Sequence, residues 1–169
     1  MFDLHTHTVF SDGKNAPEEM VLAAMEKGLE GIGFSEHSWV HFDDGSMPRE
    51  QEQRYLEETQ RLKEKYAGSI RVFRGLERDY YTEEDGEYEY IIGSVHWVGL
   101  PGGKFVPVDW YPETLVEDVI TCFGGDWYAL AEAYYLLEAD VVRKTKCDII
   151  GHFDLLTKFN EGERYFDES

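Results

Sequence analysis

The sequence has few cysteines, few basic residues and no long hydrophobic run, and each shortage excludes a class of protein. Its cysteines, Cys122 and Cys147, form no CxxC pair, so we expect two buried thiols that are neither metal ligands nor nucleophiles. No apolar run approaches the roughly 20 residues that cross a bilayer. The N-terminus has no signal-peptide pattern, so we expect a cytoplasmic location.

Positive charge is also scarce, because 16 lysines and arginines stand against 35 acidic residues, for a net charge of −19. Such a surface repels nucleic acids and anionic membranes, so we expect neither as a partner. An acidic surface that keeps the chain in solution accounts for most of this charge. A phosphorylated small molecule would be repelled too, unless a local positive centre such as a cluster of divalent metals overrides the charge.

The pattern of apolar segments predicts one α/β domain. With 42% hydrophobic residues in 169, the chain can bury a core, and no linker divides it. Short apolar segments alternate with helical ones, which predicts a parallel sheet or barrel with helices outside. We expect a short buried strand at 2–7, further strands at 31–35, 70–76, 90–95 and 147–151, and helices at 17–28, 49–66, 113–122 and 126–146.

Two histidines near the N-terminus indicate a metal site. In Asp3-Leu4-His5-Thr6-His7-Thr8, His5 and His7 occupy positions i and i+2 of an expected strand, so both side chains point to the same face. Neutral imidazole is a common ligand for zinc, manganese and iron. The pair could therefore hold one divalent cation.

Further candidate ligands follow the expected strands. His37, Glu77, His96 and His152 each close one of them, and the ends of barrel strands are where catalytic groups collect. Any one histidine would more often be structural. Five of the six histidines in one such pattern would need five separate structural reasons, so we interpret the set as a metal centre.

The remaining polar candidates are open to two readings. Asp12 could bond its own backbone in a turn, or supply oxygen to a metal, which its neighbours favour. Glu77 would be costly if unpaired after an apolar strand, and a metal-bridging role removes that cost. Asp79 and Asp154 are expected to support ligands or structure, and His41 to lie on the surface.

The motifs together resemble the PHP (polymerase and histidinol phosphatase) superfamily, and nearly the whole chain carries them in order. Met47-Pro48-Arg49, Glu77-Arg78-Asp79-Tyr80 and His152-Phe153-Asp154-Leu155 resemble its monofunctional histidinol-phosphatase branch. The superfamily motifs are Asp3 to Thr8 with Ser11-Asp12-Gly13, Ser35-Glu36-His37-Ser38, Gly75-Leu76-Glu77, Gly93-Ser94-Val95-His96 and Ile150-Gly151-His152.

The resemblance implies a distorted (β/α)7 barrel that holds two to three divalent ions, which could be zinc, manganese or iron. Glu77, His96 and His152 would form the catalytic group. The implied metal ligands are His5 and His7 for a first ion, Glu77 as a bridge, His96 and His152 for a second ion, and Asp12 and His37 for a third.

One departure from the family is important. Its members usually continue further and end their site with an Asp-x-His motif, whereas no histidine follows His152 here. We therefore expect residues 1–169 to be a single PHP domain that is truncated at its C-terminus, without the closing strands, and with an open sheet edge.

The function implied is hydrolysis of a phosphomonoester by a metal-activated water, with histidinol phosphate of histidine biosynthesis as the substrate. The alternatives are a PHP phosphoesterase for another substrate, such as a nucleotide, and a metal-binding fragment without turnover. Arg49, Lys158 and Arg164 could contact phosphate, although surface roles are simpler. Asp43, Asp44 or Glu83–Asp85 could form an acidic rim for the cationic amine. The sequence does not predict the oligomeric state.

Overall fold

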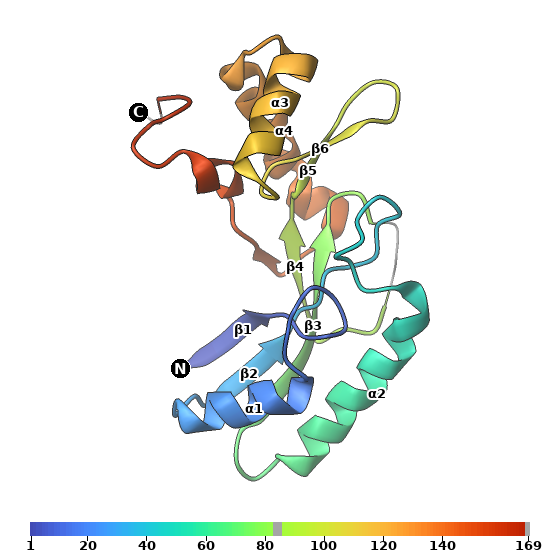
Figure 1. Ribbon diagram of the computed structural model, residues 1–169. Coiled ribbons are helices and arrows are strands. Elements are labelled where there is room, and N and C mark those ends of the chain that lie inside the picture. The colour runs from blue at the N-terminus through green and yellow to red at the C-terminus, as the bar shows by residue number, and fades with distance from the viewer. Residues whose placement is uncertain (83–85, 168–169) are drawn as a thin grey trace.

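The computed structural model describes residues 1–82 and 86–167, which form a mixed α/β structure around a curled parallel half-barrel (Figure 1). All neighbouring strand pairs of this sheet are parallel. The order in the sheet is β1-β2-β3-β4-β7, with bounds Phe2–Thr6, Gly31–Phe34, Arg71–Asp79, Tyr90–Ser94 and Ile149–Ile150.

The N-terminal part packs two helices against one side of strands β1 to β3. Helix α1 (Pro17–Glu26) begins with proline at its first turn, where no backbone N–H is needed, and the Glu19 side chain accepts from the Ala16 N–H at 2.8 Å. Helix α2 (Arg49–Lys65) buries Tyr55, Thr59 and Leu62 and exposes a charged face. Their apolar faces and those of β2 and β3 form one hydrophobic core.

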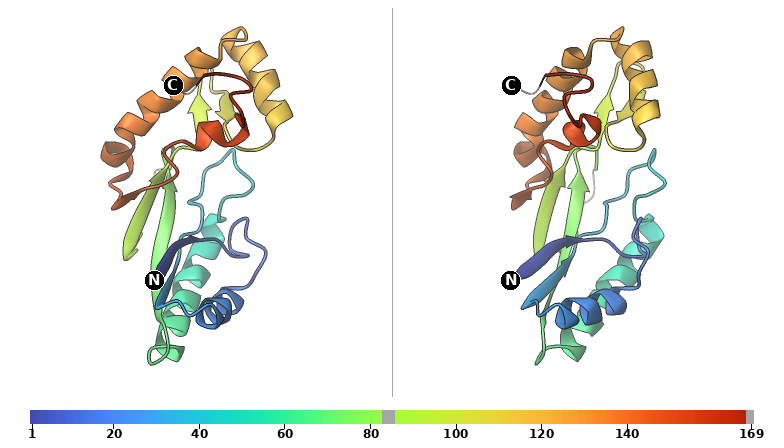
Figure 2. Two further views of the ribbon diagram at one scale, coloured as in Figure 1. Left: turned by 90° about the vertical axis from the view of Figure 1, so that its left-hand side faces the viewer. Right: turned by 60° about the vertical axis from the view of Figure 1, so that its left-hand side comes forward.

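The C-terminal part has its own core. Helices α3 (Pro112–Phe123) and α4 (Trp127–Thr145) pack against a hairpin of β5 (Trp97–Gly99) and β6 (Phe105–Pro107), with a short 3-10 helix at Leu155–Phe159. Figure 2 shows this part beyond the arrowheads of β3 and β4. It therefore faces the edge of the sheet at which the expected site residues lie.

The expected strands and helices are present, with some differences in extent. Strand β3 runs past Glu77 to Asp79, because its first half pairs with β2 and its second half with β4. The expected loop 99–112 contains most of the β5–β6 hairpin. The opening strand is not buried but lies exposed at the sheet edge, as does β7. Cys122 and Cys147 are free and only half-buried. No helix within the described residues is long and apolar enough to cross a membrane.

The hydroxyl groups of two tyrosines lie against backbone carbonyl groups of the sheet, and the tyrosine rings need space that glycines leave. The Tyr55 hydroxyl lies 3.0 and 2.6 Å from the carbonyl oxygens of Phe34 and Gly75, and Tyr90 lies 2.7 Å from that of Leu4. A Cβ at Gly75 would lie 2.2 Å from the Tyr90 ring. The glycine therefore makes room for a ring whose hydroxyl satisfies backbone carbonyls at the curl of the sheet.

A buried carboxylate holds the loop that follows β1. Glu36, fully buried after β2, accepts from the Thr8 N–H at 3.0 Å, from the Thr8 hydroxyl at 2.7 Å and from the Ser11 hydroxyl at 2.5 Å. Hydrogen bonds to an ionised acceptor are stronger than neutral ones. Glu36 thus fixes the turn that carries Asp12 against the end of β2.

Glu36→Gln is expected to lower the free energy of unfolding by about 2–4 kcal/mol, because the amide keeps the shape but places an N–H₂ group against N–H and O–H donors. Urea unfolding of the metal-free chain measures this. Glu26→Gln, on the exposed face of α1, is the matched control and should change stability by less than about 0.5 kcal/mol. Equal effects of the two substitutions would contradict the role of Glu36.

Candidate metal centre

Five histidines converge on the carboxylate of Glu77, which is fully buried in β3. Each of its two oxygens lies within 3.4 Å of at least two imidazole nitrogens. The distances are 3.2 Å from Oε1 to His5 Nε2, 3.4 Å to His96 Nε2 and 2.9 Å to His152 Nε2, and 3.1 Å from Oε2 to His7 Nε2 and 3.0 Å to His37 Nδ1.

Several of these contacts are short without being hydrogen bonds. His7 Nε2 and Glu77 Oε2 are buried and 3.1 Å apart, yet neither has a hydrogen-bond partner in acceptable geometry. Two ligand atoms that share an ion at bond lengths of about 2.0–2.2 Å are separated by about 3.0–3.4 Å. The spacing and the unsatisfied buried atoms therefore fit a metal centre with nitrogen and oxygen ligands.

The cluster shifts the protonation of its members. Burial opposes ionisation of Glu77, but the surrounding histidines, His96 first, outweigh it and hold the pKa of the carboxyl well below its usual range. Burial also opposes a charge on His7, yet the carboxylates of Asp12 and Glu77 raise its pKa to about 9. Without metal, these shifts favour ionised carboxylates and a protonated His7, which attract one another.

The strands explain why the histidines meet. His37 pairs with Glu77 as a parallel bridge after β2, and the Ser38 N–H donates to the Glu77 carbonyl at 2.8 Å. His152 follows β7, where the Gly151 N–H donates to Gly93 at 2.9 Å. A Cβ at Gly151 would lie 2.2 Å from the Ser94 hydroxyl, so glycine before His152 permits the close approach.

Supporting polar groups orient the cluster. Asp79 Oδ2 lies 3.1 Å from His96 Nδ1, and Nε2 of that ring faces Glu77. This is the arrangement expected when Asp79 supports a ligand. The Ser94 hydroxyl donates to Glu77 Oε1 at 2.7 Å. Asp154 is exposed at the start of the 3-10 helix.

Asp12 both lies in a turn and faces the cluster. Its carboxylate lies 2.9 Å from His7 Nδ1 and 3.7 Å from His37 Nε2. The next residue must be glycine, because a Cβ at Gly13 would lie 2.5 Å from the backbone of His7 and Thr8. The structure therefore places Asp12 in a turn with its carboxylate toward two histidines, and its role as a ligand stays a prediction.

Three groups of described residues could each hold one ion. The first is the same as the predicted first site with its bridge. The second adds His7 to the predicted pair of Asp12 and His37. The third contains His37 where the prediction has His152. The groups are His5, His7 and Glu77; His7, Asp12 and His37; and His37, Glu77 and His96.

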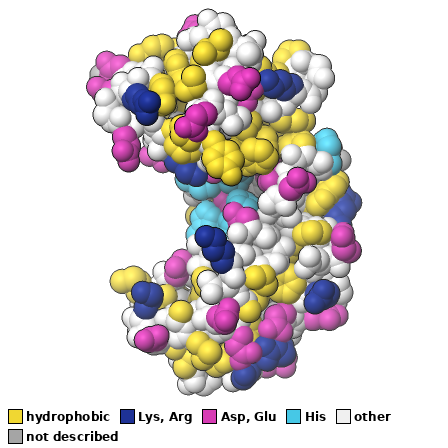
Figure 3. All heavy atoms as spheres, viewed as in Figure 1, with side chains coloured by type: hydrophobic (Ala, Val, Ile, Leu, Met, Phe, Trp, Pro, Cys, Tyr) yellow, Lys and Arg dark blue, Asp and Glu magenta, His cyan; other side chains and the backbone are white. Residues whose placement is uncertain are grey.

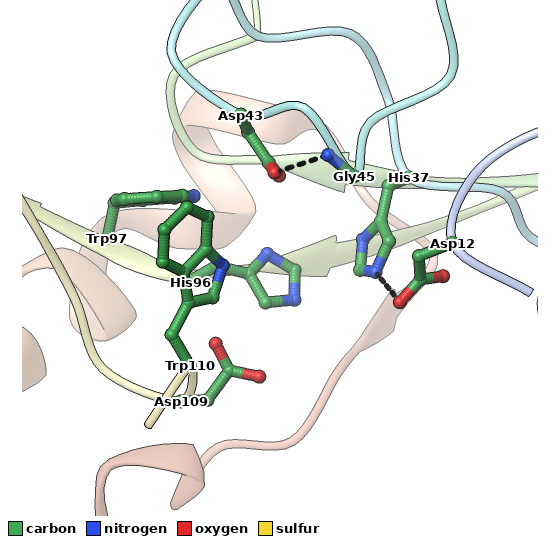
Figure 4. A pocket seen from close by; sticks show the side chains of 8 residues that line it. All are labelled: Asp12, His37, Asp43, Gly45, His96, Trp97, Asp109 and Trp110. Atoms are coloured by element: carbon green, nitrogen blue, oxygen red, sulfur yellow. Dashed lines mark hydrogen bonds and ion pairs between the residues drawn. The ribbon is translucent and has the colours of Figure 1, made fainter. Parts of the chain in front are cut away.

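The centre lies at the floor of a hollow between the two parts of the chain, where the histidine side chains gather (Figure 3). A cavity of about 220 Å³ opens there (Figure 4). Motif reasoning did not find four of its residues. Gly45 lies in the loop before α2, and the β5–β6 hairpin brings Trp97, Asp109 and Trp110 to the strand ends. The cavity is lined by Asp12, His37, Asp43, Gly45, His96, Trp97, Asp109 and Trp110.

The other candidates lie outside the centre. His41 is exposed and contacts the rings of Phe42 and Phe105, as expected for a surface histidine. Arg49 stacks on Trp39, and Arg164 on Tyr165. Lys158 binds the Asp109 backbone oxygen at 2.9 Å and its carboxylate at 3.3 Å, and lines a second cavity that adjoins Asp12.

Known proteins with similar sequences support the interpretation of the motifs. A "Probable histidinol-phosphatase" of Deinococcus radiodurans is 33% identical over 171 residues, which cover 93% of this chain and 62% of that protein. The "Histidinol-phosphatase" of Bacillus subtilis is 28% identical, over 93% of this chain and 67% of that protein. The chain thus spans about three fifths of the length of the Deinococcus relative.

Solved structures share the fold. The crystal structure of hisK from Listeria monocytogenes superposes with a TM-score of 0.80 at 23% identity, over 95% of this chain and 70% of that one. Histidinol phosphate phosphatase of Lactococcus lactis, complexed with zinc, L-histidinol and phosphate, gives 0.69 at 24% identity, over 93% and 59%. The α/β PHP fold is therefore confirmed.

The family match covers almost the whole chain and agrees with the superfamily motifs, while the named relatives agree with the motifs of the histidinol-phosphatase branch. Residues 3–169 match the PHP domain, so the chain belongs to the PHP domain family.

Proposed function

We propose that this chain is a metal-dependent phosphatase that hydrolyses histidinol phosphate to histidinol and phosphate. The observation that carries the proposal is the convergence of five imidazoles on the buried Glu77 carboxylate, at separations typical of atoms that share metal ions. The histidinol-phosphatase names of the relatives indicate the substrate. Histidine biosynthesis in the cytoplasm is part of the same proposal.

The proposed ligands would hold two to three divalent ions, which could be zinc, manganese or iron. When bound, such ions neutralise phosphate oxygens and lower the pKa of a water. Glu77 would bridge two of them, because its two oxygens face different histidines. The proposed ligand set is His5, His7, Asp12, His37, Glu77, His96 and His152, with Glu77, His96 and His152 as the catalytic group.

The residues of the chain contribute positioning and charge. Asp79 holds the His96 ring through Nδ1, and Ser94 holds Glu77, so both side chains are fixed before substrate binds. Of the candidate phosphate contacts, Lys158 lines a cavity that also includes Asp12, so we place it beside the proposed ligands. Of the proposed acidic rim, Asp43 lines the cavity beside the centre, and Glu83–Asp85 lie outside the described residues.

The first test is turnover. The purified chain, supplied with Mn²⁺ or Zn²⁺, is expected to release phosphate from histidinol phosphate faster than from a panel that includes nucleoside monophosphates. Phosphate release measured under initial-rate conditions gives kcat/KM for each ester. Preference for a nucleotide would replace the substrate assignment. Metal binding without turnover of any ester would favour the non-catalytic alternative.

The second test concerns the ligands. His96→Ala and His152→Ala should each reduce the metal content by about one ion per chain and lower kcat by about 100-fold or more, since each removes a nitrogen that faces Glu77. Elemental analysis after gel filtration counts the ions. His41→Ala, outside the centre, is the control and should keep the metal content and the rate. Full metal content in both site variants would defeat the ligand assignment.

The third test uses pH. Imidazole binds metal only when neutral, and His7 of the metal-free chain has its pKa raised to about 9, so protons compete with metal below that value. The proton on His7 stabilises the metal-free fold fully below about pH 6.5, and this contribution is lost as the pH rises toward 9.

At a fixed Mn²⁺ concentration, the increase in melting temperature caused by the ion should therefore grow from pH 6 to pH 8.5. Thermal unfolding with and without the ion measures the difference at each pH, and His41→Gln should show the same profile as the unaltered chain. An increase that stays constant or shrinks over this range would contradict proton competition at the ligands.

A further inference from the structure

The cavity beside the metal centre is lined by residues that the proposed ligands do not account for. Besides His37, His96 and Asp12, these are Asp43, Asp109, Trp97 and Trp110. Figure 4 shows the carboxylates of Asp43 and Asp109 on opposite sides of the cavity, with the Trp110 ring between them. A substrate whose phosphate lies at the ligands could place its alcohol part against these residues.

The two carboxylates differ in their partners. Asp109 is paired with Lys158, whose ammonium lies 3.3 Å from Oδ2. Within residues 1–82 and 86–167, no lysine or arginine forms an ion pair with Asp43, whose carboxylate accepts from the Gly45 N–H at 2.9 Å. Burial raises the pKa of Asp43 above its usual value, and the Gly45 N–H and the charges of His37 and His96 offset only part of this shift.

Hydrogen bonds hold the loop of Asp43 in place. The Ser46 hydroxyl donates to the Asp43 backbone oxygen at 2.7 Å, and the Asp43 N–H donates to Val40 at 3.2 Å. Next to it, Phe42 packs edge-on against Trp97 at 5.2 Å between ring centres, and Trp97 packs in the same way against Trp110 at 5.2 Å. The carboxylate is therefore positioned before any ligand arrives.

We propose that Asp43 determines substrate specificity by pairing with an ammonium group on the alcohol part of the phosphomonoester, against the rings of Trp97 and Trp110. The inference rests on the proposed function and extends it to the feature of the substrate that is recognised. In histidinol phosphate, two carbon atoms separate the amine from the ester oxygen, so the phosphate and the ammonium would occupy the same cavity. Aromatic rings also attract a cation that lies over their faces.

The test compares histidinol phosphate with its analogue that lacks the amine, 3-(imidazol-4-yl)propyl phosphate, on the metal-loaded chain. The unaltered chain should prefer the amine in kcat/KM by about tenfold or more, as expected for a hydrogen-bonded ion pair. Asp43→Asn should reduce this preference to about twofold or less. Asp44→Asn is the matched control, because Asp44 is the exposed neighbour in the same loop and should leave the preference unchanged.

Histidinol and 3-(imidazol-4-yl)propanol are the alcohols of these two esters. Their binding to the metal-loaded chain, measured by calorimetry, gives the same comparison without turnover. An Asp43→Asn variant that retains the preference, or that loses both ligands equally, would overturn the role of Asp43 while the phosphatase assignment stands. Absence of binding of either alcohol to the unaltered chain would also overturn it. Failure of the proposed function would give a different result. The chain would then hydrolyse other phosphomonoesters in preference to both histidinol phosphate and its analogue without the amine.

Discussion

The structure depends on one constraint, which is that a carboxylate buried in the middle of a sheet must have its charge compensated. An isolated ionised group in an apolar interior costs far more than the net stability of a domain. Glu77 meets this constraint through nitrogens from five histidines that come from four separate segments of the chain. Parallel strands make this compensation possible, because their carboxyl ends lie at one edge of the sheet and each can contribute a side chain there.

Close approach of backbone explains the glycines that accompany the ligands. Gly13 lets the Asp12 turn fold back on His7, Gly75 makes room for the Tyr90 ring, and Gly151 lets His152 pass Ser94. In each case a Cβ would lie 2.5 Å or less from another atom. The family motifs therefore combine a chemical group with the small residue that allows it to reach the centre, so function and packing are specified by the same short segments.

The sequence predicted those parts of the site that have a local signature. His5 and His7 occupy positions i and i+2 at the end of the first strand, and His37, His96 and His152 each follow an apolar run, so their meeting required only that the strands be parallel. The contacts of Glu36 and the positions of Asp109 and Trp110 carry no such signature, because they depend on how the loop after β1 and the β5–β6 hairpin pack. The exposure of β1 was missed for a similar reason, since a short apolar strand has the same pattern at an edge as in the centre of a sheet.

The net charge of the molecule and the local charge of the cavity act on a substrate over different distances. A chain with a net charge of −19 repels anions at a distance, yet at physiological salt this repulsion is screened within about 8–10 Å. Binding of a phosphate therefore depends on local charge, which the ligand cluster can supply. The cavity beside it contains Asp43 and also Asp109, whose charge Lys158 offsets, so on the proposed function Asp43 would disfavour a purely anionic substrate. Opposite charges at the ligands and at Asp43 would then select for a zwitterionic molecule, in which neither end alone would bind as well as both together.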